Sequence, residues 1–205
     1  MRDYIIMTDS CCDLSQQEVE ELDLTVLPLS FTIEGKTLLN TPDHADMSPE
    51  EFFAKIAAGA DCTTAAVNVG QFTDAMEKVL QEGKDILCVC FSSALSTTYQ
   101  SACIAAEDLR EKYPEAKILV IDSLSASRGQ GMLLYRAVRE RREKNLTIDE
   151  LDAYVRSIIQ SQCHWFIVDD LNHLKRGGRV SSPRRRWSAR CSASSPSCTR
   201  TARAA

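Results

Sequence analysis

Short apolar runs alternate along this chain with longer stretches in which apolar residues recur every three or four positions. Runs of the first kind are typical of buried strands, and stretches of the second kind are typical of amphipathic helices. The alternation favours an α/β fold, in which helices flank a mainly parallel sheet with right-handed crossovers. The predicted strands are residues 4–7, 25–33 with an interruption at Pro28, 86–91, 118–121 and 164–168.

Helix starts are marked by capping signals. Ser48 is followed by Pro49 and two acids, which suits an N-cap, a first helical position and a first turn. Thr147 has Glu150 three residues later, the pattern of a capping box. The predicted helices are residues 15–22, 48–57, 69–81, 96–112, 129–144 and 147–161.

Hydroxyl side chains gather where the strand at residues 86–91 ends and the next helix begins. Helix N-terminal N–H groups beside such hydroxyls suit an anion or a strong hydrogen-bond acceptor. Plain helix capping is the alternative, since Ser and Thr are preferred N-cap residues. The residues concerned are Ser92, Ser93, Ser96, Thr97 and Thr98.

Similar polar groups follow other predicted strands. Asp9 and Ser10 follow the first strand, Asp122 follows the strand at 118–121, and Thr64 lies in an expected loop before a helix. The carboxyl ends of parallel strands meet at one sheet edge, so we expect these groups to gather there as a ligand site. Turns and caps are the alternative for each residue taken alone.

Composition and charge narrow the function classes. The nine cysteines are an odd number without zinc spacing, which favours free thiols in a reducing cytoplasm. A signal peptide and an apolar run of the ~18 residues of a membrane span are not found, so we expect a soluble cytoplasmic protein. Residues 1–182 carry 18 basic and 29 acidic residues, a net charge of −11, which argues against nucleic acid as a partner.

Catalytic motifs are not found in this sequence. A serine-dependent enzyme needs a histidine base, and none of His44, His164 and His173 lies in a recognisable triad context. The sequence has neither a Walker A loop nor a nucleophile elbow, and its metal-ligating residues do not cluster. We therefore expect neither an enzyme nor a metal site.

Taken together, these motifs resemble those of the DegV family of bacterial fatty-acid-binding proteins. The resemblance extends from residue 1 to 182 and includes Thr8-Asp9-Ser10, Thr64 and Asp122-Ser123. Its most specific parts are Phe-Ser-Ser-Ala-Leu-Ser-Thr-Thr-Tyr-Gln-Ser-Ala at 91–102 and Leu-Lys-Arg-Gly-Gly-Arg-Val-Ser at 174–181. The chain departs from the family at Thr97, where Gly is usual and a Thr side chain would crowd the loop or require another backbone torsion. It also departs at Ala65-Ala66, where a hydroxyl or amide residue is common, so this loop is expected to form fewer hydrogen bonds.

The resemblance implies a carrier that is not an enzyme and has no cofactor. It implies a long-chain fatty acid with its carboxylate at Thr64 and Ser93 and its tail in an apolar cavity. It also implies delivery of the fatty acid to a fatty-acid kinase for phospholipid synthesis. Ser92 and Ser96 are possible head-group or helix-cap residues, Arg179 is a possible head-group or kinase contact, and the oligomeric state is left open.

The last part of the chain departs from the family. We expect residues 1–165 to form the N-terminal α/β domain, 166–182 the entry to a largely missing second domain, and 183–205 an aberrant, disordered tail rich in Arg, Ser and Ala. Degenerate codons for the tail, read in a shifted frame, permit a translation that continues the family pattern, so a frameshift is our hypothesis. The alternative function is then an inactive truncated fragment, or a protein-interaction domain without lipid binding.

Overall fold

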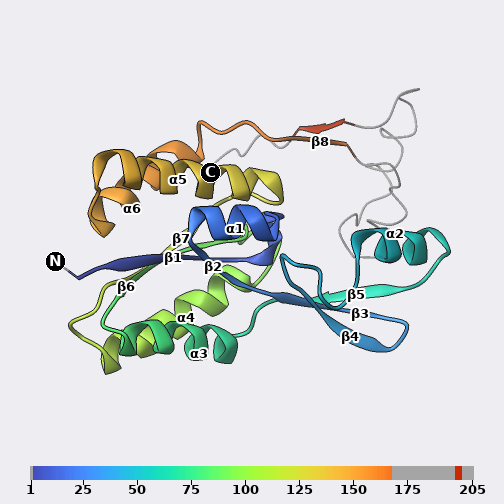
Figure 1. The fold of residues 1–205 in the computed structure, drawn as a ribbon, viewed down its shortest axis with the longest axis horizontal. Helices are drawn as coiled ribbons and strands as arrows, with labels where there is room; N and C mark the ends of the chain where they lie inside the picture. The colour runs from blue at the N-terminus through green and yellow to red at the C-terminus, as the bar shows by residue number, and fades with distance from the viewer. Residues whose placement is uncertain (1, 168–196, 200–205) are drawn as a thin grey trace. The chain divides into compact units, whose positions relative to one another are not determined.

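The computed structural model describes residues 2–167 and 197–199 of this chain. It contains two compact units, Met1–Ser161 and Gln162–Ala205, and the domain division expected from the sequence stays a prediction. A four-stranded parallel sheet in the order β2-β1-β6-β7 is the centre of the first unit (Figure 1). These strands are β1 (Tyr4–Asp9), β2 (Leu24–Leu27), β6 (Asp85–Cys90) and β7 (Ile118–Asp122).

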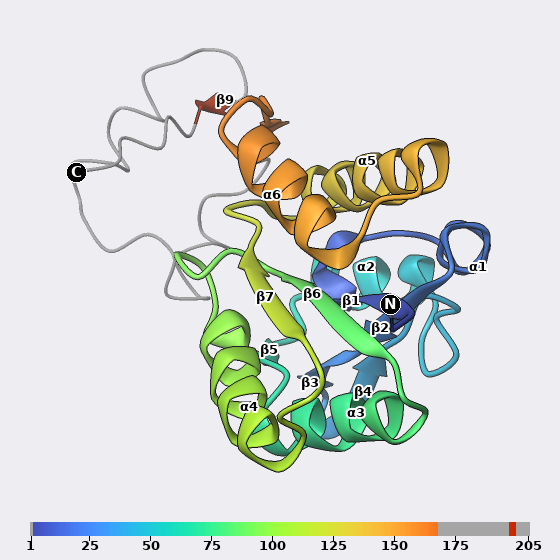
Figure 2. The same ribbon diagram turned by 90° about the vertical axis from the view of Figure 1, so that its left-hand side faces the viewer.

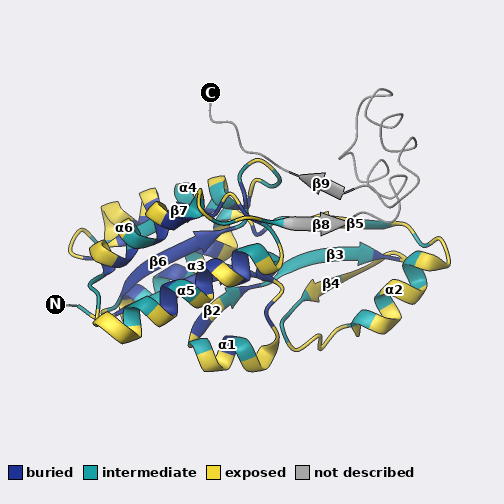
Figure 3. Ribbon diagram, turned by 90° about the horizontal axis from the view of Figure 1, so that it is seen from above, coloured by how far each residue is buried: buried dark blue, intermediate teal, exposed yellow. Residues whose placement is uncertain are grey.

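Helices cover both faces of this sheet, as the α/β prediction requires (Figure 2). Strand β6 is buried along its whole length and contributes alternate residues to the two faces (Figure 3). Leu87 and Val89 pack into the core with α1, α5 and α6, whereas Ile86 and Cys88 pack into the core with α3 and α4. The helices are α1 (Gln16–Leu22), α2 (Pro49–Ala57), α3 (Val69–Gln81), α4 (Thr98–Lys112), α5 (Arg128–Lys144) and α6 (Ile148–Ile159).

A second, antiparallel sheet corrects two expectations. The stretch expected at residues 25–33 is two strands in different sheets, because Pro28, which has no N–H to donate, separates β2 from β3. Thr64 lies in a strand, β5, and not in a loop, because β5 pairs with β3. The sheet has the order β4-β3-β5 and is formed by β3 (Leu29–Ile33), β4 (Lys36–Asn40) and β5 (Cys62–Ala65).

The expected capping signals act as predicted. Ser48 caps α2 by accepting a hydrogen bond from the N–H of Glu51, and Thr147 forms a complete capping box with Glu150. Side-chain oxygens cap α1 and α3 as well, whereas α4 and α5 have no side-chain cap bond. Among the described residues, no helix is both long and apolar enough to cross a membrane.

The second unit contains a short antiparallel pair. β8 (Trp165–Ile167) pairs with β9 (Ser197–Thr199) and not with the parallel sheet that we expected it to join. Three residues of the tail expected to be disordered therefore form a strand. Residues 168–196 and 200–205 lie outside the described part of the chain, and the expectation for the rest of the tail stays a prediction.

Helix α5 approaches the loop after β1 very closely at one glycine. A Cβ atom on Gly131 would lie 2.8 Å from the carbonyl oxygen of Cys12 and 2.9 Å from Cδ2 of Leu14. Cys12 ends the 3-10 turn η1 (Ser10–Cys12). Only a residue without a side chain fits here, so Gly131 sets the distance between α5 and the end of β1.

We predict that Gly131→Ala destabilises the protein by about 1–3 kcal/mol through overpacking against the Cys12 carbonyl. Helix propensity alone would give the opposite sign, since Ala is favoured over Gly in a helix by about 1 kcal/mol. The free energy of unfolding in urea measures the effect. Met132→Ala on the same turn is the control, because Met132 is 52% exposed. Equal or greater stability of Gly131→Ala would contradict the close approach.

Candidate functional site at the carboxyl edge of the parallel sheet

The carboxyl ends of two neighbouring strands, β6 and β7, are joined by backbone hydrogen bonds. The N–H of Ser123, after β7, donates to the carbonyl of Cys90 at the end of β6 over 3.1 Å. The N–H of Ser92 donates to the carbonyl of Ser125 over 3.1 Å. The loops after β6 and β7 are therefore held side by side, as the strand order predicts.

Asp9 fastens the loop after β1 to the loop after β6. Its carboxylate accepts hydrogen bonds from the N–H of Phe91 over 2.7 Å and from the N–H of Cys11 over 3.1 Å. The side chain is fully buried, and burial raises the pKa of the Asp9 carboxyl, although these N–H bonds act in the opposite direction. Asp9 thus holds the two loops together and is itself shielded from solvent.

Ser10 fastens the antiparallel sheet to the same edge. Its hydroxyl accepts hydrogen bonds from the N–H of Leu29 over 3.0 Å and from the side-chain amide of Asn40 over 3.2 Å. Leu29 begins β3, and the next residue, Ser30, pairs with Ala65 at the end of β5. Leu29, Ser10 and Asp9 therefore connect the sheet that contains β5 to the loop after β6.

Thr64 is an exposed residue of β5. It pairs directly with Phe31 of β3, and directly paired residues lie on the same face of a sheet. The ring of Phe31 packs edge-to-face against Phe52 of α2, with 5.4 Å between the ring centroids. Thr64 is thus on the sheet face toward α2, next to an aromatic cluster.

The three serines after β6 differ in their surroundings. Ser93 is half-buried, and its N–H donates to Oδ1 of Asp122 over 3.1 Å. Ser92 is only 1% exposed, and its hydroxyl has no hydrogen-bond partner among the described residues. The Ser96 hydroxyl accepts the N–H of Thr98, the first residue of α4, over 3.2 Å. The Ser96 hydroxyl therefore contacts the first residue of α4 and the Ser92 hydroxyl does not, and the head-group roles of both residues stay predictions.

Thr97 does not require the backbone torsion of a glycine. Its φ is −81°, a value open to any residue. The side chain is exposed. Thr97 therefore has none of the backbone strain that we considered for a Thr in place of the usual Gly.

Gln130 is a buried polar residue of this edge that our sequence reasoning missed. It is fully buried, and its side-chain amide donates to the Thr8 hydroxyl over 3.0 Å, while Thr8 donates to the carbonyl of Val89 over 2.7 Å. These bonds tie the first turn of α5 to β1 and β6. A single polar residue on an otherwise apolar helix face is the signal that would have identified it.

Two other candidate residues, His164 and Arg179, are not part of the first unit. Arg179 lies outside the described residues. Burial lowers the pKa of His164, which lies in the second unit. The described residues contain no group of three or more His, Cys, Asp or Glu side chains that could hold a metal ion.

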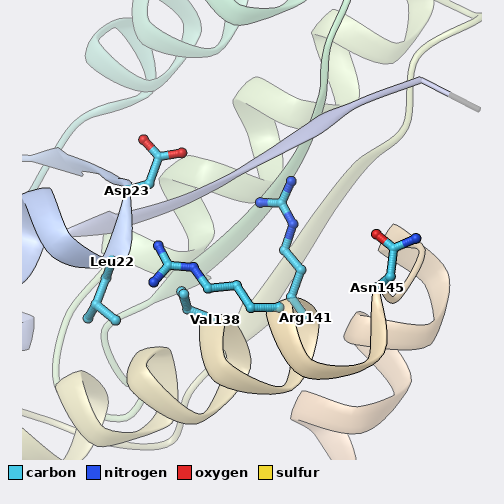
Figure 4. Close-up of a pocket in the computed structure, with 6 residues that line it drawn as sticks. Leu22, Asp23, Val138, Arg141 and Asn145 are labelled. Carbon is cyan, nitrogen blue, oxygen red and sulfur yellow. The ribbon is translucent and has the colours of Figure 1, made fainter.

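A surface pocket of about 290 Å³ lies where α5 ends and β2 begins (Figure 4), lined by Leu22, Asp23, Val138, Arg141, Arg142 and Asn145.

Comparison with known proteins identifies relatives of this chain. The sequence model described as "Uncharacterised protein, DegV family" matches residues 4–184. A DegV domain-containing protein of Clostridium perfringens is 40% identical over 182 residues, which are 89% of this chain and 62% of that protein. A DegV domain-containing protein of Lactococcus lactis is 39% identical over 177 residues, 86% of this chain and 61% of that protein. The chain thus spans about three fifths of the length of these relatives.

Solved structures show the same fold. A fatty-acid-binding DegV family protein of Thermus thermophilus has a TM-score of 0.79 and 28% identity, covering 97% of this chain and 68% of that one. A stearic-acid-binding protein of Eubacterium ventriosum has a TM-score of 0.78 and 28% identity, covering 87% of this chain and 60% of that one. The expected α/β fold with a parallel sheet flanked by helices is confirmed.

We predict a specific pH effect of Asp9. Burial raises its pKa above the ordinary value of 3.8, so above that pH the unfolded chain loses the proton first. The contribution of Asp9 to the free energy of unfolding therefore falls as the pH rises, until the folded carboxyl has also ionised. Asp9→Asn takes up no proton here, so above about pH 4, for as long as the folded Asp9 carboxyl keeps its proton, the stability of the variant should fall less, or rise more, than that of the wild type.

Urea denaturation at a series of pH values measures this difference. Asp13→Asn is the control, because it removes an exposed carboxyl from the same turn, at a φ of 51° that Asn tolerates. Parallel pH curves for wild type and Asp9→Asn would show that burial does not perturb this carboxyl.

Proposed function

This chain belongs to the DegV family, and we propose on that basis that it binds a long-chain fatty acid at the carboxyl edge of its parallel sheet. The fatty acids bound by the related proteins of known structure support this class of ligand. The single observation in this chain that carries the proposal is the Ser92 hydroxyl, which is buried and without a partner in the described residues.

A buried hydroxyl without a partner costs about 1–3 kcal/mol. A ligand oxygen placed beside Ser92 and Ser93 removes that cost, because each hydroxyl can donate to a carboxylate. The N–H of Ser93 is already held by Asp122, and Asp9 holds the N–H of Phe91. The loop backbone is thereby fixed before a ligand arrives, which reduces the ordering entropy lost on binding.

The head group in this proposal is held by neutral donors. Thr64, Ser92 and Ser93 supply hydroxyls, and Arg179 is kept as a proposed cation near the head group or the partner. Neutral donors require no buried fixed charge, so the protein avoids a large desolvation penalty. Most of the affinity then comes from the hydrocarbon tail, at about 0.8 kcal/mol per buried methylene.

The aromatic cluster beside Thr64 offers apolar surface to the tail. Helix α2 has no buried residue, and Phe53 on this helix is 66% exposed. Its neighbour Phe52 packs between Phe31 and Phe53. Exposed aromatic surface of this kind marks a place where a ligand or another protein surface is buried. The hydroxyl of Thr64 and this cluster together fit an amphipathic ligand.

We further propose that the protein presents the fatty-acid carboxylate to a fatty-acid kinase and is not itself an enzyme. A serine nucleophile needs a base within hydrogen-bond reach. In the part of the chain that the structure describes, neither Ser92 nor Ser93 has a histidine partner. The alternative is a fragment without lipid binding, because the chain spans about 62% of its curated relative.

We predict that Ser93→Ala, Ser92→Ala and Thr64→Val each weaken fatty-acid binding about tenfold to a hundredfold, since a hydrogen bond to a charged group is worth about 1.5–3 kcal/mol. Native mass spectrometry with oleate, followed by extraction and identification of the lipid, measures loading. Competition titration with a fluorescent fatty acid gives the affinities.

Thr63→Val is the matched control, because Thr63 is the exposed neighbour of Thr64 on the opposite face of β5. It should bind the fatty acid within about twofold of the wild type, a change typical of a surface substitution. A wild-type protein that carries no lipid and takes up none would favour the fragment. Full affinity in Ser92→Ala and Ser93→Ala would exclude this edge as the head-group site.

A further inference from the structure

The loop after β7 contains one apolar residue in a backbone conformation that apolar residues avoid. Leu124 has a φ of 50°, in the left-handed region where the Cβ atom of most residues is crowded. Among the described residues that are not glycine, every other positive φ belongs to a polar residue. Two of these, Asp23 and Asn145, end helices, where this conformation is common. Leu124 therefore stores backbone strain that its residue type does not explain.

Hydrogen bonds on both sides hold Leu124 in this conformation. Its own N–H donates to Oδ1 of Asp122 over 3.0 Å. The flanking residues Ser123 and Ser125 are buried, and the Ser125 hydroxyl donates to the carbonyl of Ser123 over 2.9 Å. Both also bond through their backbone to the end of β6 and the loop that follows it. Strain persists only where the surroundings fix a conformation in this way, and it is concentrated at ligand-binding sites.

The side chain of Leu124 is 40% exposed, although the residues on either side of it are buried. It packs into neither of the two apolar cores of the described residues. A Gly or Asn in its place would adopt the same backbone conformation with less strain. The strained backbone thus holds in place an apolar group that the cores of the protein do not use.

Leu124 lies next to the proposed head-group site. Oδ1 of Asp122 accepts both the N–H of Leu124, over 3.0 Å, and the N–H of Ser93, over 3.1 Å. Because both nitrogen atoms bond to one oxygen, they are at most about 6 Å apart. A carboxylate bound by the Ser93 hydroxyl would therefore have its first methylene groups close to the Leu124 side chain.

We propose that Leu124 is a specificity residue of the head-group site, and that its side chain packs on the methylene groups next to the fatty-acid carboxylate. The site then selects acyl chains that have no polar substituent near the head group. A hydroxyl on those carbons would be buried against Leu124 without a hydrogen-bond partner, which is unfavourable. This inference rests on the proposed function, and it adds a contact residue and a limit on the class of fatty acid.

Competition titration with laurate and palmitate measures the contribution of Leu124. Leu124→Asn should weaken the binding of both acids about tenfold or more, because each methylene that loses its apolar contact lowers the affinity about fourfold. The factor should be equal for the two acids, since the methylenes concerned are next to the carboxylate in both. A loss confined to palmitate would place Leu124 at the far end of the chain and overturn the inference.

Two further variants distinguish the apolar contact from other effects. Leu124→Met keeps an apolar side chain of similar volume, so the loss of affinity should stay below about threefold. Leu39→Asn is the matched control, because Leu39 is 42% exposed on β4. Leu39 pairs with Ser30, the neighbour of Phe31, and so lies on the face of the antiparallel sheet opposite to Thr64. Leu39→Asn should bind palmitate within about twofold of the wild type.

Titration with 3-hydroxypalmitate measures the selectivity. The wild type should bind this acid about tenfold or more weakly than palmitate, because an apolar contact surface disfavours an added hydroxyl. Leu124→Asn should reduce this ratio, since its amide can form a hydrogen bond with the hydroxyl. An equal ratio in the wild type and the variant would show that Leu124 does not select the ligand.

The outcomes separate this inference from the proposed function. A wild type that binds neither laurate nor palmitate would refute the carrier function itself. Fatty-acid binding that Ser93→Ala weakens and Leu124→Asn leaves unchanged would refute only the role of Leu124. Asn accepts a positive φ more readily than Leu, so Leu124→Asn should unfold in urea at the wild-type concentration or above. Lower stability with full affinity for palmitate would assign Leu124 to packing within the protein.

Discussion

The carboxyl edge of this protein depends on one buried carboxylate. Burying an ionised carboxylate is unfavourable unless hydrogen bonds replace those lost from water. Asp9 accepts backbone N–H groups from two different loops, and these hydrogen bonds offset part of the cost of its burial. The burial that raises the pKa of Asp9 also excludes water from these bonds. The positions of the loops after β1 and β6 follow from this arrangement.

Much of the fold was predictable because its main strands are short, continuous apolar runs. The run at β6 is buried on both faces, so its sequence alone identifies it. Strands β4 and β5 were not predicted, because Lys36–Asn40 and Cys62–Ala65 have mixed, largely exposed sequences and become strands only by pairing with β3. Such non-local pairing leaves little trace in a local pattern. The error at Thr64 has the same cause.

The sequence predicted where the candidate site lies, but not which role each of its residues has. Hydroxyls after strands and at helix starts indicated the edge, yet Ser92, Ser93 and Ser96 are the same residue type within five positions. Their differences come from the turn of the backbone, which buries Ser92, ties Ser93 to Asp122 and directs Ser96 to α4. Gln130 was missed because its partner Thr8 is more than a hundred residues away in the chain.

At this edge, buried or half-buried carboxylates hold backbone groups, and hydroxyl side chains are left for other partners. Asp9 and Asp122 use their carboxylates on backbone N–H groups, so the loops are rigid without any bond to the ligand. The hydroxyls of Ser92 and Ser93 are the groups that we propose for the fatty-acid carboxylate. Because α5 begins beside these loops and Gly131 brings it close to the end of β1, the first turn of α5 belongs to the same edge. Under the proposed function, a fixed edge would reduce the ordering entropy lost when the fatty acid binds.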